Sequence, residues 1–469
     1  MHDSSQIQIM ITMIAYMAIV IIIGIAFAKK ANKNTDSYFL GGRTLGPWVT
    51  AMSAEASDMS GWLLMGLPGV AYWCGIADAA WTAIGLALGT YVNWLITSKR
   101  LRRYSEKANA ITLPEFFSNR FHEKSKIIMM VAALFILIFF TVYAASCLVT
   151  CGKLFSTLFG FDYVPMMIVG AVFVLIYTII GGFLAESASD FMQAIVMVIA
   201  LIVVVITGTV AAGGLDAVVD NAKSIPGFFE FFGIANPVTD ANGVQQSLNG
   251  QPLFGEAGAY GVLSVVSCLA WGLGYFGMPQ VLLRFMAIRS EKELKSSRRI
   301  ATVWCLISLV IAVFIGVIGR ALYPTALTTS SEAENVFILL ATNLLPAVLA
   351  GLVMAGILAA TISSSDSYLL IAASAFSKNI FQGLIHKKAS DKQVLVISRI
   401  TLLAITGVAI IIALDENSVI FNIVSFAWAG FGATFGPLML MSLFWKRINR
   451  WGAIAGMIGG GVMVFVWNL

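Results

Sequence analysis

Residues 53–69 read SAEASDMSGWLLMGLPG and interrupt an apolar stretch, 46–72, that is otherwise long enough to cross a membrane. Glu55 and Asp58 stand in this stretch beside serines, glycines and a proline. A carboxylate at the centre of a bilayer costs at least about 2.5–3.5 kcal/mol on insertion scales, so chains keep one mainly where it has a partner or a task. The rest of the sequence must therefore supply a partner for this interrupted segment.

Composition places the chain in the membrane. Of its 469 residues, 59% are hydrophobic and only 11% are charged, a balance that soluble globular proteins do not have. Apolar runs long enough to span a bilayer as helices recur along the whole chain. Residues 1–469 therefore form a single membrane domain, with twelve predicted spans at 8–28, 46–72, 75–98, 127–158, 163–184, 189–213, 257–285, 300–323, 346–377, 394–414, 418–445 and 451–468.

The distribution of basic residues predicts the orientation of these helices. With twelve spans, all but three of the 29 Lys and Arg fall on one side, in loops or near helix ends, and the exceptions are Lys153, Lys223 and Arg320. Because loops rich in Lys and Arg stay in the cytoplasm, we expect a multi-pass protein of the cell membrane with its N-terminus outside. The net charge of +5 is then a signal of topology and gives no reason to expect nucleic-acid binding.

The sequence carries no signature of an enzyme. Its five cysteines all lie in or beside apolar runs without a CxxC spacing, and its three histidines form no HExxH motif. No nucleophile with a neighbouring base is evident. We therefore expect neither catalysis nor a transition-metal site.

A second interrupted helix lies five spans after the first. Residues 267–279 read SCLAWGLGYFGMP, where Gly272, Gly274, Gly277 and Pro279 weaken the helix. Because five is an odd number, 46–213 and 257–445 are predicted to be inverted repeats, with 8–28 as a leading helix and 451–468 as an additional one. Broken segments at matching places in inverted repeats indicate the binding site of a secondary transporter. The alternative is that the glycines only allow close helix packing.

The ninth span supplies oxygen ligands. Residues 355–370 read AGILAATISSSDSYLL, in which Ala360, Ser363 and Ser364 share one helix face. A hard cation prefers several oxygen ligands. Serine hydroxyls from this face, with carbonyl groups released near Ala56 and Met59, would provide them. The alternative is that the hydroxyls only bond back to carbonyls one turn earlier.

Several stretches resemble the sodium/solute symporter family, and within it the sodium/proline symporters. They occur in the family's order and spacing between residues 36 and 437. These stretches are DSYFLGGRTLGPWVTAMSAEASDMSGWLLMGLPG (36–69), ITLPEFF (111–117), FFTVYAAS (139–146), GGFLAESASDFMQA (181–194), WGLGYFGMPQVLLRFMA (271–287) and SFAWAGFGATFGP (425–437).

The resemblance implies a fold, an activity and a set of site residues. The fold is all-α and LeuT-like, with two inverted five-helix repeats whose first helices are broken. The activity is sodium-coupled symport of L-proline by alternating access, with Na⁺ as the coupling ion and Asp58 essential for coupling. Sodium is expected on Ala56, Met59, Ala360, Ser363 and Ser364, and the substrate on Ser60, Gly61, Trp62, Tyr143, Trp271, Tyr275 and Pro279.

The aromatic members of this set also have a physical role of their own. Proline is a small zwitterion with an apolar ring, so its site needs aromatic walls and hydrogen-bond donors for the carboxylate. Ends of broken helices can supply the donors. For each aromatic residue the alternative role is packing in the core.

The sequence departs from the family pattern in three places. Glu55 stands where proline symporters often have a small or uncharged residue, and Asp366 stands in SSSDS where some relatives have serine. The family also usually carries one more helix after the last one of this chain. We expect Asp190 and Asp366 either to form a second cation site or to contact Lys or Arg of the basic loops.

Other functions remain as alternatives. The same machinery could carry another small organic solute, such as pantothenate, a monocarboxylate or another amino acid, with sodium or protons. An ion channel would favour a continuous polar lining, whereas the polar residues here cluster at one depth. The expected partners are proline and the lipid bilayer, and no obligate protein partner is evident.

Overall fold

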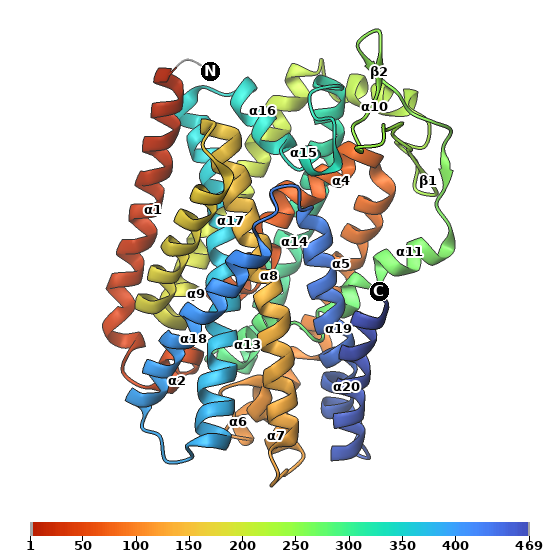
Figure 1. The fold of residues 1–469 in the computed structure, drawn as a ribbon. Coiled ribbons are helices and arrows are strands. Elements are labelled where there is room, and N and C mark those ends of the chain that lie inside the picture. The colour runs from red at the N-terminus through yellow and green to blue at the C-terminus, as the bar shows by residue number, and fades with distance from the viewer. Residues whose placement is uncertain (1–2, 468–469) are drawn as a thin grey trace.

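The computed structural model describes residues 3–467, and these fold into a bundle of long helices (Figure 1). The first half contains α1 (Asp3–Ala31), α2 (Thr35–Leu40), η1 (Gly41–Arg43), α3 (Pro47–Gly61), η2 (Trp62–Gly66), α4 (Leu67–Cys74), α5 (Ile76–Ile96), α6 (Ser98–Lys107), α7 (Leu113–Arg120), α8 (Ile127–Phe159), α9 (Tyr163–Ala211) and α10 (Leu215–Ser224).

The second half continues the helical pattern. It contains α11 (Val262–Leu269), α12 (Trp271–Gly274), α13 (Pro279–Ala287), η3 (Glu291–Glu293), α14 (Leu294–Leu322), α15 (Ser330–Ala333), α16 (Val336–Leu344), α17 (Ala347–Ser374), η4 (Ala375–Ile385), α18 (Asp391–Ile412), α19 (Ile420–Phe444) and α20 (Arg450–Trp467). Between α10 and α11, β1 (Gly233–Ile234) pairs antiparallel with β4 (Gly258–Ala259), and β2 (Ser247–Leu248) with β3 (Gln251–Pro252).

The predicted membrane-spanning class is confirmed. Among residues 3–467, ten helical stretches are long and apolar enough to cross a bilayer, and one of them, Val262–Ala287, contains the break between α12 and α13. In lipid every backbone polar group needs an internal partner, which is why these apolar segments form helices. The broken segment α3–η2–α4 provides a further span, and α9 contains two. Residue 468, the end of the last predicted span, lies outside the described residues.

Helix α9 reverses direction at Gly182. This residue has φ 55° and ψ −170°, and the Tyr177 and Ser189 hydroxyl oxygens, on either side of it, lie 2.5 Å apart. In a continuous helix, twelve residues would separate them by about 18 Å. The two arms of α9 therefore run antiparallel as two spans, as the predicted segments 163–184 and 189–213 require.

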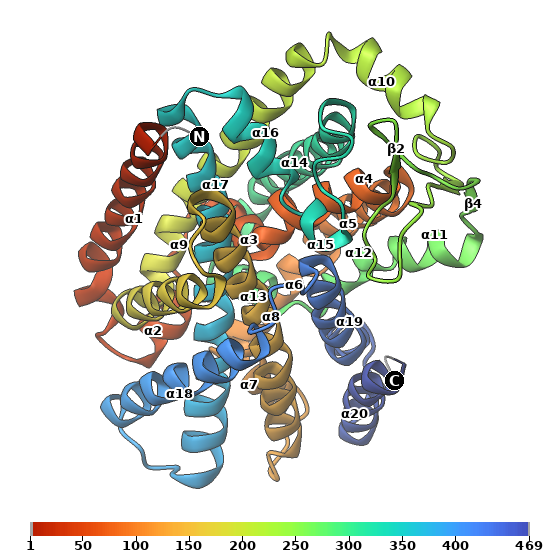
Figure 2. The same ribbon diagram turned by 45° about the horizontal axis from the view of Figure 1, so that its top comes forward.

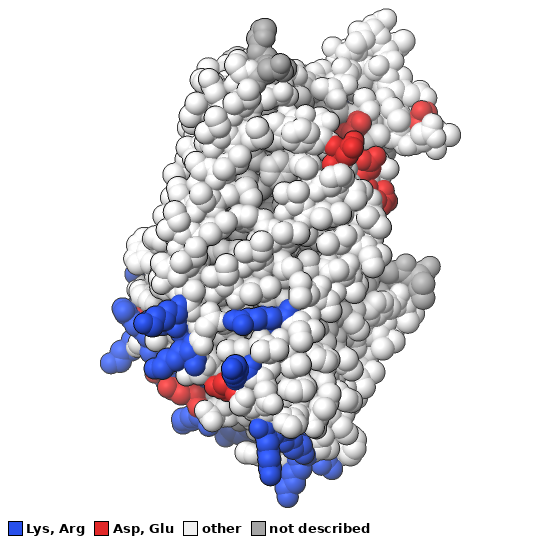
Figure 3. All heavy atoms as spheres, turned by 60° about the vertical axis from the view of Figure 1, so that its left-hand side comes forward, with Lys and Arg blue, Asp and Glu red and all other residues white. Residues whose placement is uncertain are grey.

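The two ends of the bundle differ in charge. The N-terminus, α10, the β-strands and α15–α16 lie at one end, and α2, α6, α7 and the loop after η4 lie at the other (Figure 1). Figure 3 shows Lys and Arg side chains gathered at this second end, which we call the basic end. The charge segregation expected of a membrane protein is therefore visible on the surface.

Helix α17 lies in the centre of the bundle. It packs against α1, α3, α8 and α9. In the span Ala347–Ile385, which begins with α17, 78% of the most apolar 18-residue segment is buried. The corresponding segment of α20 is only 22% buried. Figure 2 shows α1 and α20 at the periphery of the bundle. The serines predicted to bind a cation are therefore on the most buried of the ten apolar spans found within residues 3–467.

Replacing Gly182 by alanine should destabilise the fold. A side chain at positive φ with extended ψ, a backbone region adopted almost only by glycine, costs about 1–3 kcal/mol, and the new Cβ would lie 2.7 Å from the Tyr38 ring. Gly456→Ala is the matched control, because a Cβ there meets nothing within 4 Å. We expect the thermal unfolding midpoint of the detergent-purified protein to fall for Gly182→Ala only. Equal midpoints for the two variants would contradict the strained reversal.

Candidate functional site

The first predicted interruption is present in the middle of the membrane span. Helix α3 ends at Ser60 and Gly61, and Ser60 adopts φ 40° and ψ −171°. The chain then continues through the wider turn η2 into α4. The Trp62 N–H donates to the carbonyl groups of Met59 and Ser60 across the break. Regular helical bonding therefore fails where the sequence places its serines, glycines and acids.

Serine hydroxyls of α17 meet this break. Ser363 Oγ donates to the Ala56 carbonyl oxygen at 2.8 Å, and Ser364 Oγ lies 3.2 Å from the same oxygen. The backbone N–H of Ser60 donates to Ser364 Oγ at 3.0 Å. Ser363 Oγ is also 3.3 Å from the Ala360 carbonyl oxygen. The structure thus brings four of the five predicted sodium-binding residues together, and the fifth, Met59, directly precedes Ser60.

The neighbouring serine behaves differently. Ser365 Oγ donates to the Thr361 carbonyl oxygen at 2.6 Å, within its own helix. Bonding back one turn, the alternative considered for this serine run, is therefore the arrangement at Ser365. Ser363 and Ser364 reach across to α3 instead. They lie on the face that points toward the break.

The two acids of α3 point toward different helices. Asp58 Oδ1 accepts a hydrogen bond from Gln280 Nε2 of α13 at 3.1 Å, while Glu55 Oε1 accepts one from Trp94 Nε1 of α5 at 3.4 Å. Both side chains are almost fully buried. Within residues 3–467, the second oxygen of each carboxylate has no hydrogen-bond partner. Asp58 thereby connects the first broken helix to the second.

The second predicted interruption separates α12 from α13. Helix α12 ends at Gly274, Met278 is extended with ψ 108°, and Pro279 begins α13. Gly272 packs directly on α5, where an added Cβ would lie 2.0 Å from the Gly85 carbonyl oxygen. For Gly272 the close-packing role is therefore the one that the structure supports. The break itself falls after it.

Aromatic side chains form a connected cluster between the two breaks. Trp62 stacks on Trp271 with ring centres 5.5 Å apart, and Tyr275 packs edge-on against Trp428 at 5.0 Å. Tyr143 stacks on Tyr368 at 4.0 Å. The rings of this cluster are Trp62, Tyr143, Trp271, Tyr275, Tyr368, Phe421 and Trp428. The structure thus brings together the four predicted aromatic residues and adds three that were not predicted.

Tyr143 links the aromatic cluster to the break in α3. Its hydroxyl donates to the Asp58 carbonyl oxygen at 3.1 Å and accepts from Trp428 Nε1 at 2.9 Å. Tyr143 therefore connects the backbone at Asp58 to the Trp428 ring through two hydrogen bonds.

The three small predicted substrate residues have different surroundings. Ser60 Oγ accepts from the Trp62 N–H at 3.2 Å. Gly61 packs against Thr150, whose Oγ1 would lie 2.4 Å from an added Cβ. Pro279 borders a narrow gap with Phe39 and Leu113. Ser60 and Gly61 thus lie at the break, beside Trp62, whereas Pro279 also borders a gap away from the aromatic rings.

A buried arginine that sequence reasoning missed lies beside the acids of α9. Arg284 of α13 pairs with Glu186 and lies 3.2 Å from Asp190, with none of its side chain exposed. Its Nε donates to Ser53 Oγ at 3.0 Å and its Nη2 to Ser367 Oγ at 2.9 Å. One guanidinium group therefore joins α13 to α3, α9 and α17.

Asp190 and Asp366, expected either to share a cation or to contact Lys or Arg, have different partners. Asp190 Oδ2 accepts from Ser53 Oγ at 2.7 Å and pairs with Arg284. Asp366 Oδ1 accepts from the Ser367 N–H at 2.7 Å. Asp190 thus contacts an arginine, which is the second of the two arrangements expected from the sequence, but this arginine lies in the broken helix α13 and not in a loop. The sequence could have indicated a buried, paired arginine here, because Arg284 is a lone basic residue inside an apolar run.

A second buried ion pair lies toward the end opposite the basic end. Lys153 Nζ of α8 is 2.8 Å from Glu334 Oε2 and donates to the Ser418 carbonyl oxygen at 2.7 Å. The same Glu334 carboxylate accepts the N–H groups of Ile420 and Phe421 at the start of α19. This contact joins α8, the α15–α16 segment and α19 beside the aromatic cluster. Phe421 takes part in both, because its N–H donates to Glu334 and its ring belongs to the cluster.

Comparisons with known proteins agree with this geometry. Residues 38–460 match the sodium:solute symporter family, and the chain belongs to that family. It is 42% identical over 443 residues to the high-affinity proline transporter PutP of Bacillus subtilis (strain 168), covering 94% of this chain and 88% of that protein. It is 40% identical over 464 residues to the sodium/proline symporter of Escherichia coli (strain K12), covering 98% and 87%.

A solved structure shares the fold. The substrate-bound, outward-open state of a Na⁺-coupled sialic acid symporter superimposes with a TM-score of 0.76, at 18% sequence identity and with 98% of both chains covered. At this identity the likeness concerns the fold alone. The predicted LeuT-like architecture with two broken helices is therefore confirmed.

Removing the charge of Arg284 should strongly destabilise the protein. Arg284→Gln leaves Glu186 and Asp190 buried without their cation, and loss of one partner of a buried ion pair costs about 3–5 kcal/mol. Glu186→Gln in the same background should recover part of this loss. Arg103→Gln is the control, since it breaks an exposed pair with Glu291 that is worth about 1 kcal/mol or less. Thermal unfolding midpoints test this, and similar midpoints for Arg284→Gln and Arg103→Gln would contradict it.

Proposed function

We propose that this protein couples the entry of sodium to the uptake of L-proline across the cell membrane by alternating access. One observation carries the proposal: hydroxyl groups of Ser363 and Ser364 reach the Ala56 carbonyl oxygen at the break in α3. Membership of the sodium:solute symporter family supports sodium as the coupling ion. Proline as the solute is supported by the printed names of relatives that are about 40% identical over nearly the whole chain.

The proposed sodium site consists of neutral oxygens. Its members are the residues Ala56, Met59, Ala360, Ser363 and Ser364. Carbonyl and hydroxyl oxygens suit a hard cation, and a site without a titratable ligand has no means of exchanging sodium for a bound proton. The enclosed position of α17 would remove the ion from bulk water during transport.

The proposed proline site lies among the aromatic residues. The walls are Trp62, Tyr143, Trp271 and Tyr275, and Trp428 completes the cluster through its contacts with Tyr143 and Tyr275. Backbone at Ser60, Gly61 and Pro279, beside the two breaks, would position the zwitterion's charged groups. In this structure the rings contact one another, so binding must separate them.

Asp58 is proposed to couple the two sites. It lies between the sodium-site residues Ala56 and Met59, its carbonyl oxygen accepts from Tyr143, and its carboxylate accepts from Gln280. A change in the backbone on binding sodium would therefore move groups that contact the aromatic cluster. The role of Asp58 in this account is to link the two broken helices.

The basic end is proposed to face the cytoplasm, with the N-terminus outside. The segregation of Lys and Arg visible in Figure 3 supports this orientation. Residues 46–213 and 257–445 then act as the two inverted repeats, each opening with a broken helix. Alternating access would move these repeats relative to each other around the fixed site.

Arg284 suggests a coupling ratio of one. Its guanidinium group already supplies a positive charge beside Glu186 and Asp190, where a second cation at Asp190 and Asp366 was one of the two arrangements expected from the sequence. A charge fixed to the protein needs no ion from the gradient. We therefore propose that one sodium ion enters with each proline.

Uptake by the reconstituted protein tests this function. Proline is electrically neutral as a zwitterion, so each transport event should carry one positive charge into the vesicle. One cation contributes about 2.3 kcal/mol at 100 mV and about 1.4 kcal/mol more for a tenfold gradient, enough for accumulation of several hundredfold. Radiolabelled proline uptake and charge movement are measured together in proteoliposomes. Uptake that is unchanged when potassium replaces sodium would refute the function, and a ratio of two would refute the role given to Arg284.

Ser364→Ala should weaken sodium binding more than proline binding. The substitution removes a proposed sodium ligand but touches none of the aromatic rings, so the sodium concentration for half-maximal uptake should rise severalfold more than the corresponding proline concentration. Ser365→Ala is the matched control, because its hydroxyl bonds within α17. Equal changes in both requirements, or the same result for Ser365→Ala, would count against the ligand assignment.

Trp271→Ala should weaken proline binding. Removing a wall that is buried against the ligand typically costs 1 kcal/mol or more. Trp81→Ala is the control, since Trp81 packs against Phe231 and Phe232 outside the aromatic cluster. Equilibrium binding of labelled proline at saturating sodium measures the difference. Normal proline affinity in Trp271→Ala would assign this ring to core packing.

A further inference from the structure

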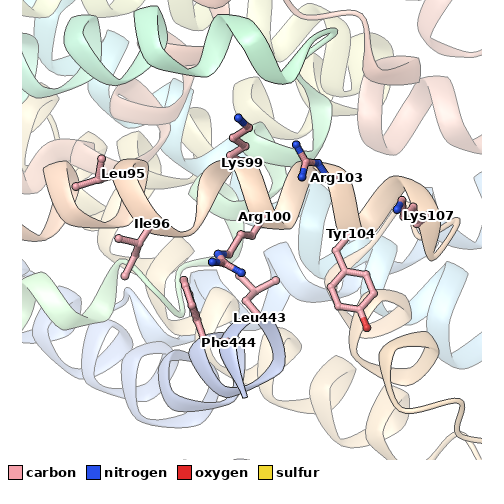
Figure 4. A pocket seen from close by; sticks show the side chains of 9 residues that line it. All are labelled: Leu95, Ile96, Lys99, Arg100, Arg103, Tyr104, Lys107, Leu443 and Phe444. Carbon is pink, nitrogen blue, oxygen red and sulfur yellow. The ribbon is translucent and has the colours of Figure 1, made fainter. Parts of the chain in front are cut away.

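An open groove at the basic end combines cationic and apolar side chains. Its volume is about 700 Å³, within the range of ligand-binding cavities. The lining comes from the end of α5, from α6 and from the end of α19 (Figure 4). The nine lining residues are Leu95, Ile96, Lys99, Arg100, Arg103, Tyr104, Lys107, Leu443 and Phe444.

Three of the four cations in this groove form no ion pair with an acidic side chain of the described residues. Arg103 pairs with Glu291 of η3 at 2.9 Å. Within residues 3–467, Lys99, Arg100 and Lys107 form no ion pair. The nearby carboxylate of Glu106 forms its ion pair with Arg102, on the buried side of α6. The groove therefore presents a surplus of positive charge.

The position of Arg100 joins the charged and apolar parts. Its guanidinium group lies 4.4 Å from the centre of the Phe444 ring, and Figure 4 shows it pointing from α6 toward the end of α19. This contact holds the guanidinium over an apolar surface. Its N–H groups, for which no acceptor is found within residues 3–467, are free to bind an anion.

The depth of the groove matches the region of lipid headgroups. Leu95 and Phe444, at the ends of two spanning helices, are about half exposed, at 46% and 44%. Trp445 and Trp451 are exposed next to them, as aromatic residues are at membrane interfaces. The apolar wall therefore faces the acyl chains, and the cations begin where the hydrocarbon ends.

We propose that this groove binds an anionic phospholipid. The phosphate diester would lie against Lys99, Arg100 and Lys107, and an acyl chain would follow Leu95 and Phe444. Basic pockets between spanning helices recognise such headgroups, and a phosphate free in solution would leave the apolar wall uncovered. The bound lipid would connect α6 to α19. Arg102 already ties α6 to the end of α13, because its Nε donates to the Ile288 carbonyl oxygen at 2.7 Å.

Lipid retention by the full chain tests the proposal. The protein is reconstituted into nanodiscs with equal amounts of phosphatidylglycerol and phosphatidylcholine, released, and the lipids that stay bound are measured by native mass spectrometry. We expect phosphatidylglycerol to be retained preferentially. Lys99→Gln/Arg100→Gln should reduce that retention about tenfold or more, because each cation near an anionic headgroup contributes separately. Lys99→Gln/Lys107→Gln, which keeps the Arg100–Phe444 contact, should also reduce it.

The matched control removes the same charge elsewhere at the basic end. Lys387→Gln/Lys388→Gln alters two exposed residues in the loop between η4 and α18 and should leave retention unchanged. Equal loss in this control would indicate general surface electrostatics and overturn the site. Displacement of the lipid by inorganic phosphate at millimolar concentration would overturn the lipid assignment. Equal retention of the two phospholipids by the native protein would do the same.

Discussion

The unwound backbone at Ser60 and the hydroxyl groups that satisfy it determine much of this structure. Backbone polar groups released inside a membrane need partners, because lipid offers none. The partners here are Ser363 and Ser364 of α17, which bond to the Ala56 carbonyl oxygen and the Ser60 N–H. This requirement fixes α3 against α17, the central helix of the bundle. It also brings the hydroxyl oxygens of Ser363 and Ser364 close to the Ala56 carbonyl oxygen. If the hydroxyl protons rotate away, all three oxygens can bind a cation.

Two buried ion pairs lie on either side of this break. Toward the basic end, Arg284 joins α13 to α3, α9 and α17, and toward the other end, Lys153 and Glu334 join α8, α15–α16 and α19. Buried pairs are costly to separate one partner at a time. In the proposed transport cycle, opening one end would therefore rearrange the ion pair at that end while the pair at the other end stays formed. The aromatic cluster, which includes Phe421 beside Glu334, lies between them.

Local patterns in the sequence were enough to predict the broken helices and the serine face of α17, because both depend on the order of neighbouring residues. The reversal of α9 also followed from the lengths of the apolar runs. Contacts between distant segments were harder to foresee. The pairing of Arg284 with Glu186 brings together residues 98 positions apart, and Trp428 meets Tyr143 from 285 positions away. The assignment of Gly272 to packing likewise required the position of Gly85 on another helix.

The central claim is that sodium at the α3 break and proline at the aromatic cluster stabilise one arrangement of the same backbone. Thermodynamic linkage then requires each ligand to raise the affinity for the other. The most direct measurement is the dissociation constant of labelled proline for the purified protein, with sodium replaced stepwise by choline. We predict that proline binds more weakly, by about tenfold or more, as sodium is withdrawn, and that Ser363→Ala/Ser364→Ala abolishes this dependence. A proline affinity that is the same in sodium and in choline would contradict the account.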